Sequence, residues 1–203
     1  MHVVGLTGGI GSGKSTIAAM LREQELPVVD ADLLGHEAYE PGTGAHRRLL
    51  ETFGEDLRGP DGRIDRRKLG GIVFGKPDQM RRLTDIVWPE IRRLAEERLR
   101  GLADDGAKMA VLEAAVLFEA GWESLCDEVW AVVAPEELAV RRVHERNGLS
   151  EADTRARIRS QMTNEERVRR SDVVIENAGT LEELRVAVEK ALAGARARAG
   201  AAA

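Results

Sequence analysis

The segment Gly8 to Ser15 constrains the fold of this chain more than any other feature of the sequence. It reads GGIGSGKS and fits the pattern G-x-x-x-x-G-K-[ST]. It follows the apolar run HVVGL and precedes a helical pattern that places Ile17, Met20 and Leu21 on one face. Glycines let the backbone turn so that successive N–H groups face one anion, and the helix N-terminus adds the positive end of its dipole. The segment therefore predicts a phosphate-binding loop between a strand and a helix.

The last two residues of this loop indicate which ligand it takes. We expect Lys14 to reach the terminal phosphates of a bound nucleotide. We expect Ser15 to ligate Mg²⁺, because a hard cation prefers oxygen ligands and accepts a hydroxyl beside phosphate oxygens. The loop thus predicts a site for a nucleoside triphosphate with Mg²⁺, but it does not choose between a switch, a motor and a kinase.

Five short apolar runs recur between helical patterns. Each is rich in valine and lacks polar alternation, which is typical of strands covered on both faces, and the intervals are long enough for helical crossovers. The sequence therefore predicts a three-layer α/β fold with a five-stranded parallel sheet, the P-loop NTPase fold. The five predicted strands are His2 to Leu6, Pro27 to Val29, Met109 to Leu117, Glu128 to Ala134 and Asp172 to Ile175.

The length of 203 residues predicts one domain, which we place at residues 1–195. The long interval before the third strand predicts a helical insertion at about residues 60–105, with one helix broken or kinked at Pro89. Two arginine-rich helices, joined by Asn147-Gly148 and with Ser150 as a cap, predict a mobile lid at about residues 136–165. A last helix from Leu181 to Leu192 leaves residues 196–203, which we expect to be a disordered tail.

The charge distribution favours a compact anionic ligand over a nucleic acid. The chain carries 30 Lys and Arg against 35 Asp and Glu, a net charge of −5. Two segments are basic: residues 63–100 hold eleven basic and six acidic side chains, and residues 141–170 hold nine and five. The single cysteine, Cys126, excludes an internal disulfide, and no apolar run is long enough to span a membrane. We therefore expect a cytoplasmic protein that binds neither nucleic acid nor membrane.

Other phosphate-loop classes fit the chain less well than a small-molecule kinase. No asparagine begins the Asn-Lys-x-Asp element with which GTPases read guanine, and the third apolar run does not end in the acidic pair usual in motor ATPases. The second predicted strand leads instead into Asp30-Ala31-Asp32. Ligands of open parallel sheets bind beyond the carboxyl ends of the strands, so one of these carboxylates is placed to accept a proton from an acceptor hydroxyl. A helix N-cap is the alternative role for either aspartate.

Taken together, these segments resemble the dephospho-CoA kinase family over nearly the whole chain. The resemblance implies an enzyme that phosphorylates the 3′-hydroxyl of dephospho-CoA with ATP and Mg²⁺, as the last step of coenzyme A synthesis. The Asp-Ala-Asp followed by histidine, soon after such a loop, is the most specific of the matches. The matching segments are GLTGGIGSGKST (Gly5 to Thr16), VVDADLLGHE (Val28 to Glu37), VLFEAGWE (Val116 to Glu123), RVHERNGLSEADTRARIRSQ (Arg142 to Gln161) and DVVIENAG (Asp172 to Gly179).

The resemblance also implies roles for individual residues. Asp32 would be the catalytic base and a contact of dephospho-CoA, with Lys14 and the lid residue Arg142 as further catalytic groups. His36 follows Asp32 by one helical turn, so we expect it to contact dephospho-CoA, with a plain position on the helix surface as the alternative. Asn177 would lie along the adenine. The loop residues that would bind ATP are Gly8, Gly9, Gly11, Ser12, Gly13, Lys14, Ser15 and Thr16.

The chain departs from the family pattern at two places, and two other functions are alternatives to the one that the resemblance implies. Trp88 stands where the family usually has histidine, and Ala115-Val116-Leu117 replaces Pro-Leu-Leu. A kinase for a nucleoside or another small hydroxyl compound is the second hypothesis, and a nucleotide-dependent regulatory or nucleic-acid-binding module is the third. With ATP and dephospho-CoA as ligands we expect a monomer, with a weak oligomer as the alternative.

Overall fold

The computed structural model describes residues 1–201 and divides them into two compact units. Unit 1 consists of Met1–Asp30 and the described residues from Leu99 onward, and unit 2 is Ala31–Arg98. The helical unit begins directly after the second strand, well before the expected start of the insertion near residue 60.

Unit 1 contains the five-stranded parallel sheet that the apolar runs predict. The strand order is β2-β3-β1-β4-β5, and all neighbouring pairs are parallel. This confirms the α/β fold class with β1 at the centre of the sheet. The strands are β1 (His2–Gly8), β2 (Val28–Asp30), β3 (Met109–Glu113), β4 (Glu128–Val133) and β5 (Val173–Glu176).

The third strand is shorter than predicted because part of its apolar run leaves the sheet and covers it. β3 ends at Glu113, and the chain then folds back to the short 3-10 helix η2 (Trp122–Leu125). Leu117 and Trp122 are buried nevertheless. A side chain on Gly5 of β1 would meet Leu117 Cδ2 at 2.9 Å and Cys126 Sγ at 2.8 Å. The apolar run therefore indicates which residues are buried, but only its first half forms a strand.

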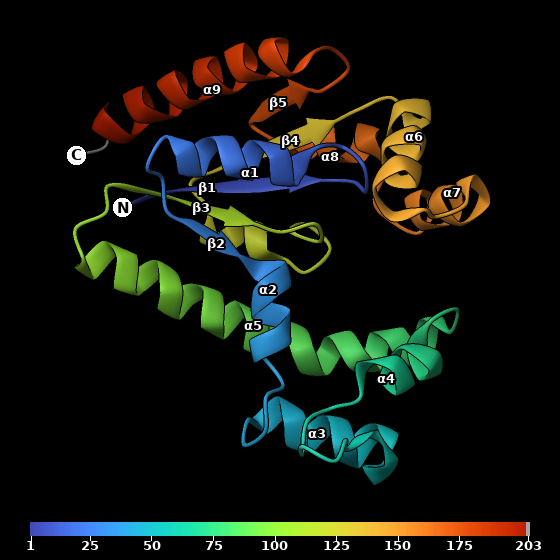
Figure 1. The fold of residues 1–203 in the computed structure, drawn as a ribbon. Helices are drawn as coiled ribbons and strands as arrows, with labels where there is room; N and C mark the ends of the chain where they lie inside the picture. Colours follow the sequence, from blue (N-terminus) through green and yellow to red (C-terminus); the bar gives the residue numbers. More distant parts are fainter. Residues whose placement is uncertain (202–203) are drawn as a thin grey trace. The chain divides into compact units, whose positions relative to one another are not determined.

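Two helices, α1 (Lys14–Glu23) and α9 (Leu181–Ala201), lie on the other face of the sheet (Figure 1). Their apolar side chains form one buried cluster with those of the strands. Trp130 in β4 is fully buried in it. The cluster positions the N-terminus of α1 at the end of β1. It includes Val4, Leu6, Ile17, Leu21, Val111, Trp130, Val132, Ile175, Leu184, Val188 and Leu192.

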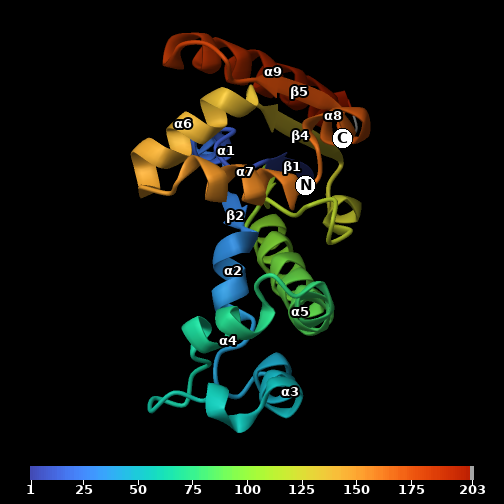
Figure 2. The same cartoon turned by 90° about the vertical axis from the view of Figure 1, so that its right-hand side faces the viewer.

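Three further helices of unit 1 are α6 (Glu136–Asn147), α7 (Glu151–Arg159) and α8 (Asn164–Arg170). α6 and α7 lie beyond the carboxyl ends of the strands, and they face the reader in the turned view of Figure 2. Gly148 ends α6 in a left-handed conformation with φ 66°, and the Ser150 hydroxyl accepts a hydrogen bond from Asp153 N. These are the end and cap expected for the predicted helix pair.

Unit 2 consists of helices: α2 (Ala31–Glu37), α3 (Gly44–Phe53), the short η1 (Glu55–Leu57), α4 (Arg66–Val73) and most of α5 (Pro77–Asp104). α5 contains Pro89 and is continuous, so of the expected break or kink at this residue the break does not occur. Proline removes one backbone hydrogen bond. The buried residues Ile86, Val87 and Ile91 on either side of it keep one apolar face, and the burial of that face outweighs the lost bond.

The end of the chain also differs from expectation. α9 continues to Ala201, although residues 196–203 were expected to form a disordered tail; residues 202–203 lie outside the described part. Ala195 is buried, and Arg198 Nη2 lies 2.5 Å from Glu128 Oε2. Alanine-rich sequence favours helix, and this ion pair holds the last turns. Within residues 1–201, no helix combines the length and apolar character needed to cross a membrane.

Candidate nucleotide site

The loop between β1 and α1 has a backbone that only glycine accommodates at two positions. Gly11 and Gly13 have φ of 74° and 96°. A Cβ on Gly11 would lie 2.6 Å from Ala139 O in α6, and one on Gly13 would overlap the side-chain amide of Asn177. Close approach and positive φ therefore both require glycine here. The loop is bounded by α6 and by the residue that follows β5.

Lys14 forms an ion pair with a carboxylate at the end of the neighbouring strand. Lys14 Nζ lies 2.8 Å from Glu113 Oε1, and the Lys14 and Glu113 side chains are only 10% and 3% exposed. Arg22 Nη2 lies 3.5 Å from the other oxygen of Glu113. In the sequence, Glu113 is an acidic residue inside the apolar run from Met109 to Leu117. Its position at the carboxyl end of a buried strand was the available signal.

Asn177 and Arg142 come together at the same loop. Asn177 Nδ2 donates to Ser12 O at 2.8 Å, and Asn177 N donates to Val133 O of β4 at 2.8 Å. Arg142 of α6 donates to Asn177 O and Asn177 Oδ1, both at 3.1 Å. Partial burial and the neighbouring charge of Arg141 lower the pKa of Arg142, which starts high enough for the guanidinium to stay charged. A buried asparagine thus joins the phosphate loop, the sheet and α6.

The remaining loop residues divide by exposure. Ser12 is buried, whereas Ser15 and Thr16 in the first turn of α1 are exposed. An exposed hydroxyl at a helix N-terminus fits Mg²⁺, which keeps several waters and commonly takes one or two protein oxygens plus phosphate oxygens. Among the described residues, no group of three or more His, Cys, Asp or Glu side chains could hold a metal by itself. Any Mg²⁺ here would therefore depend on a nucleotide for most of its ligands.

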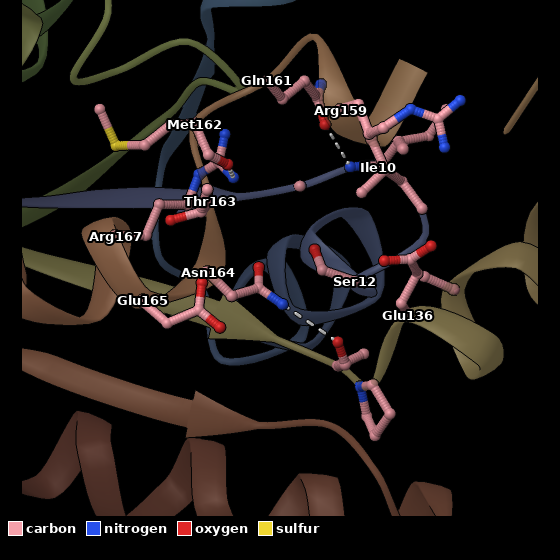
Figure 3. A pocket seen from close by; sticks show the side chains of 15 residues that line it. Ile10, Ser12, Glu136, Arg159, Gln161, Met162, Thr163, Asn164, Glu165 and Arg167 are labelled. Carbon is pink, nitrogen blue, oxygen red and sulfur yellow. Dashed lines mark hydrogen bonds between the residues drawn. The ribbon is translucent and has the colours of Figure 1, made fainter. Parts of the chain in front are cut away.

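Beside Gly9 and Ile10 of the loop is a cavity of about 480 Å³ (Figure 3). The start of α6, the end of α7, the segment that follows α7 and part of α8 complete its wall. Ile10 N donates to Gln161 Oε1 at 2.9 Å at one edge of this cavity. Arg167, only 1% exposed, also lines it. Arg167 belongs to no sequence motif, and Gln161 ends the matching segment that begins at Arg142 without any signal of a role of its own.

Asp32 and His36 belong to unit 2. Asp32 lies in the first turn of α2, directly after β2, and His36 lies in the last turn of the same helix. Both are exposed. The structure thus brings Lys14, Arg142 and Asn177 together with the phosphate loop in unit 1, and it puts the two predicted acceptor contacts on one helix of unit 2.

Comparison with known proteins adds family relations to this geometry. A model of the family described as dephospho-CoA kinase matches residues 2–183. A dephospho-CoA kinase of Geobacter sulfurreducens is 47% identical over 190 residues, which cover 94% of this chain and 96% of that protein. A crystal structure of a Thermus thermophilus protein is 42% identical, covers 95% of this chain and 97% of that one, and has a TM-score of 0.80. The structure of dephospho-CoA kinase from Campylobacter jejuni is 26% identical, covers 94% of both chains and has a TM-score of 0.70.

Proposed function

The chain belongs to the dephospho-CoA kinase family, and from this premise we propose that it transfers the γ-phosphoryl group of ATP to the 3′-hydroxyl of dephospho-CoA. The products are coenzyme A and ADP. A member of this family is an ATP-dependent phosphotransferase that acts on a hydroxyl group. The observation that carries the proposal is the family match over residues 2–183, which includes the glycine loop with Lys14 at the end of the central strand.

Lys14 neutralises the terminal phosphates in this proposal. It reaches them by exchanging Glu113 for phosphate oxygens, and Arg22 stays beside Glu113 when Lys14 leaves. The exchange keeps a buried carboxylate paired in both states, which limits its cost. The loop amides, held in shape by Gly11 and Gly13, bind the remaining phosphate oxygens.

Ser15 would hold Mg²⁺ through its hydroxyl. When bound, this ion neutralises charge that develops on the phosphate oxygens during transfer. The Ser15 position fits such a ligand because the side chain is exposed in the first turn of α1, next to Lys14.

Asp32 takes the proton from the ribose 3′-hydroxyl. The hydroxyl oxygen then forms its bond to the γ-phosphorus while the bond to the β,γ-bridging oxygen breaks, and that oxygen leaves with ADP. Support comes from the chain path, since α2 begins directly where β2 ends and places Asp32 in its first turn. His36 contacts the same substrate from the last turn of this helix.

Arg142 and Asn177 serve the nucleotide from the lid side. Asn177 lies along the adenine, and its side-chain amide binds the backbone carbonyl of Ser12 in the loop. Arg142, which is hydrogen-bonded to Asn177, brings a positive charge beside the loop. A lid at residues 136–165 that closes over ATP, with Gln161 and Met162 at its exit already fixed, excludes water and so limits hydrolysis. The proposal keeps the expectation of a monomeric, cytoplasmic enzyme that uses ATP and dephospho-CoA and binds no nucleic acid.

The test is an ATP-consumption assay with dephospho-CoA, pantetheine, adenosine, AMP and shikimate as separate acceptors. We expect turnover with dephospho-CoA to exceed that with every other acceptor by at least about a hundredfold, because binding energy from the remote part of the substrate supports transfer. Preference for adenosine or shikimate would favour the nucleoside or small-hydroxyl alternative. ATP consumption at the same rate with every acceptor and without one would favour the regulatory module.

A further inference from the structure

Gln161 links the exit of the lid to the phosphate loop. It follows α7, which ends at Arg159, and its side-chain carbonyl accepts the hydrogen bond from Ile10 N at 2.9 Å (Figure 3). Ile10 is one of the two non-glycine residues of the run GGIGSG. The bond thus fixes the first half of a loop whose other residues have little side chain to hold them.

The residue after Gln161 is fixed by a largely buried ion pair. Met162 N donates to Glu119 Oε1 at 3.2 Å, and Met162 O accepts from Arg167 Nη1 at 2.5 Å. Arg167 Nη2 also lies 3.2 Å from Glu119 Oε1. Burial lowers the pKa of Arg167 and the charge of Glu119 opposes this, and the guanidinium stays charged. Both backbone polar groups of Met162 are therefore hydrogen-bonded, and these bonds also restrain the backbone of the preceding residue, Gln161.

We propose that Gln161 is a positioning residue for nucleotide binding, which presets the phosphate loop before the nucleotide arrives. A glycine-rich loop loses much conformational freedom when it is ordered, and phosphates that must order it bind less tightly. With Ile10 N held by Gln161, part of this ordering is complete in the free protein. Because the effect belongs to the free loop, it benefits ADP and ATP alike. This inference rests on the proposed function only in taking the loop ligand to be ATP or ADP.

The experiment compares Gln161→Leu with Ser160→Ala in the full chain. Leucine keeps the approximate size of Gln161 but accepts no hydrogen bond. The control removes only the bond from Ser160 Oγ to Arg157 O, one residue away and within the lid segment. The readouts are the Kd for ADP, the Kd for a non-hydrolysable ATP analogue, kcat with dephospho-CoA, and the melting temperature without ligand.

For Gln161→Leu we expect both Kd values to rise by the same factor, about fivefold to tenfold, the effect of one lost hydrogen bond. kcat at saturation should stay within about threefold of wild type. The control should change neither affinity. Unchanged ADP affinity in Gln161→Leu would overturn the inference. So would a loss confined to kcat, because Gln161 would then act in the chemistry and not in loop order.

A second variant keeps the inference testable if Gln161→Leu does not fold. Glu119→Gln leaves Gln161 intact but removes the charge that pairs with Arg167. It should weaken ADP binding about twofold to threefold, and unchanged ADP affinity in Glu119→Gln would contradict the inference. Where Gln161→Leu folds, the double variant should bind ADP no more weakly than Gln161→Leu alone. Additive losses would contradict an action of Glu119 through Gln161. Wild-type activity with dephospho-CoA is measured separately, so that failure of the proposed function and failure of this inference give different results.

Discussion

Replacing Lys14 with alanine should damage stability as well as catalysis, because the lysine is the closest ionic partner of a buried carboxylate. Glu113 is only 3% exposed and lies 2.8 Å from Lys14 Nζ. The sequence motif alone predicts that Lys14 binds phosphate and that its loss leaves the fold intact. The ion pair changes this expectation, since Lys14→Ala leaves Glu113 with Arg22 at 3.5 Å.

The magnitude follows from the burial of the pair. Removing one partner of a fully buried ion pair costs about 3–5 kcal/mol in the free energy of unfolding. Arg22 remains, but it is 46% exposed and more distant, so it offsets only part of this loss. We therefore expect Lys14→Ala to lower stability by about 2 kcal/mol. For a chain of this size that is a fall of about 4–8 °C in Tm.

The assay is thermal unfolding of Lys14→Ala, Glu113→Gln and the double variant, each with its activity. Glu113→Gln in the Lys14→Ala background removes the buried charge that Arg22 alone then balances, so it should restore at least half of the lost stability. It should not restore phosphoryl transfer, because the cation that serves the phosphates is still absent. The reasoning is refuted if Lys14→Ala melts within about 1 °C of wild type, or if the double variant melts no higher than Lys14→Ala.

Three further predictions address other residues. Asp32→Asn should lower kcat at saturating ATP and dephospho-CoA by at least about tenfold with unchanged Tm; a smaller drop would make Asp32 a capping residue and move the base to Asp30. Gly13→Ala should lower stability by about 1–3 kcal/mol, as chemical denaturation can measure, because of its positive φ and the Asn177 amide; an unchanged midpoint would contradict that contact. Burial, with Asp127 and Glu123 nearby, raises the pKa of the Cys126 thiol to about 12, so a thiol reagent at about pH 8 should label the folded protein far more slowly than the protein in urea. Equal rates would show that the thiol is accessible and ionised.

The sequence predicts the central features of the fold because they depend on local chemistry. The glycine loop, the valine-rich strands and the Ser150 cap are each determined by neighbouring residues, and each lies where predicted. The run from Met109 to Leu117 is different. Its apolar residues are all buried or partly buried, but only the first five form the strand. The sequence pattern does not separate them, because a residue within a buried strand and a residue that covers the sheet are both apolar.

The contacts of the site are harder to predict than the motif. Lys14 meets Glu113, and Ile10 meets Gln161, across 99 and 151 residues of sequence. Such pairs are set by how strands and helices pack, and the periodicity of one segment carries no information on them. Pro89 is a similar case, since its local preference for a break is overridden by the burial of α5 on both sides of it.

The most direct test of the proposed activity uses an acceptor that lacks one oxygen. The wild-type protein is incubated with ATP and either dephospho-CoA or its 3′-deoxy analogue, and both ADP and the acceptor product are quantified by mass spectrometry. Transfer to the 3′-hydroxyl predicts equal amounts of ADP and coenzyme A from dephospho-CoA, and no phosphorylated product from the analogue. Phosphorylation of the 3′-deoxy analogue, or ADP formed from dephospho-CoA mixtures without coenzyme A, would contradict the proposed reaction.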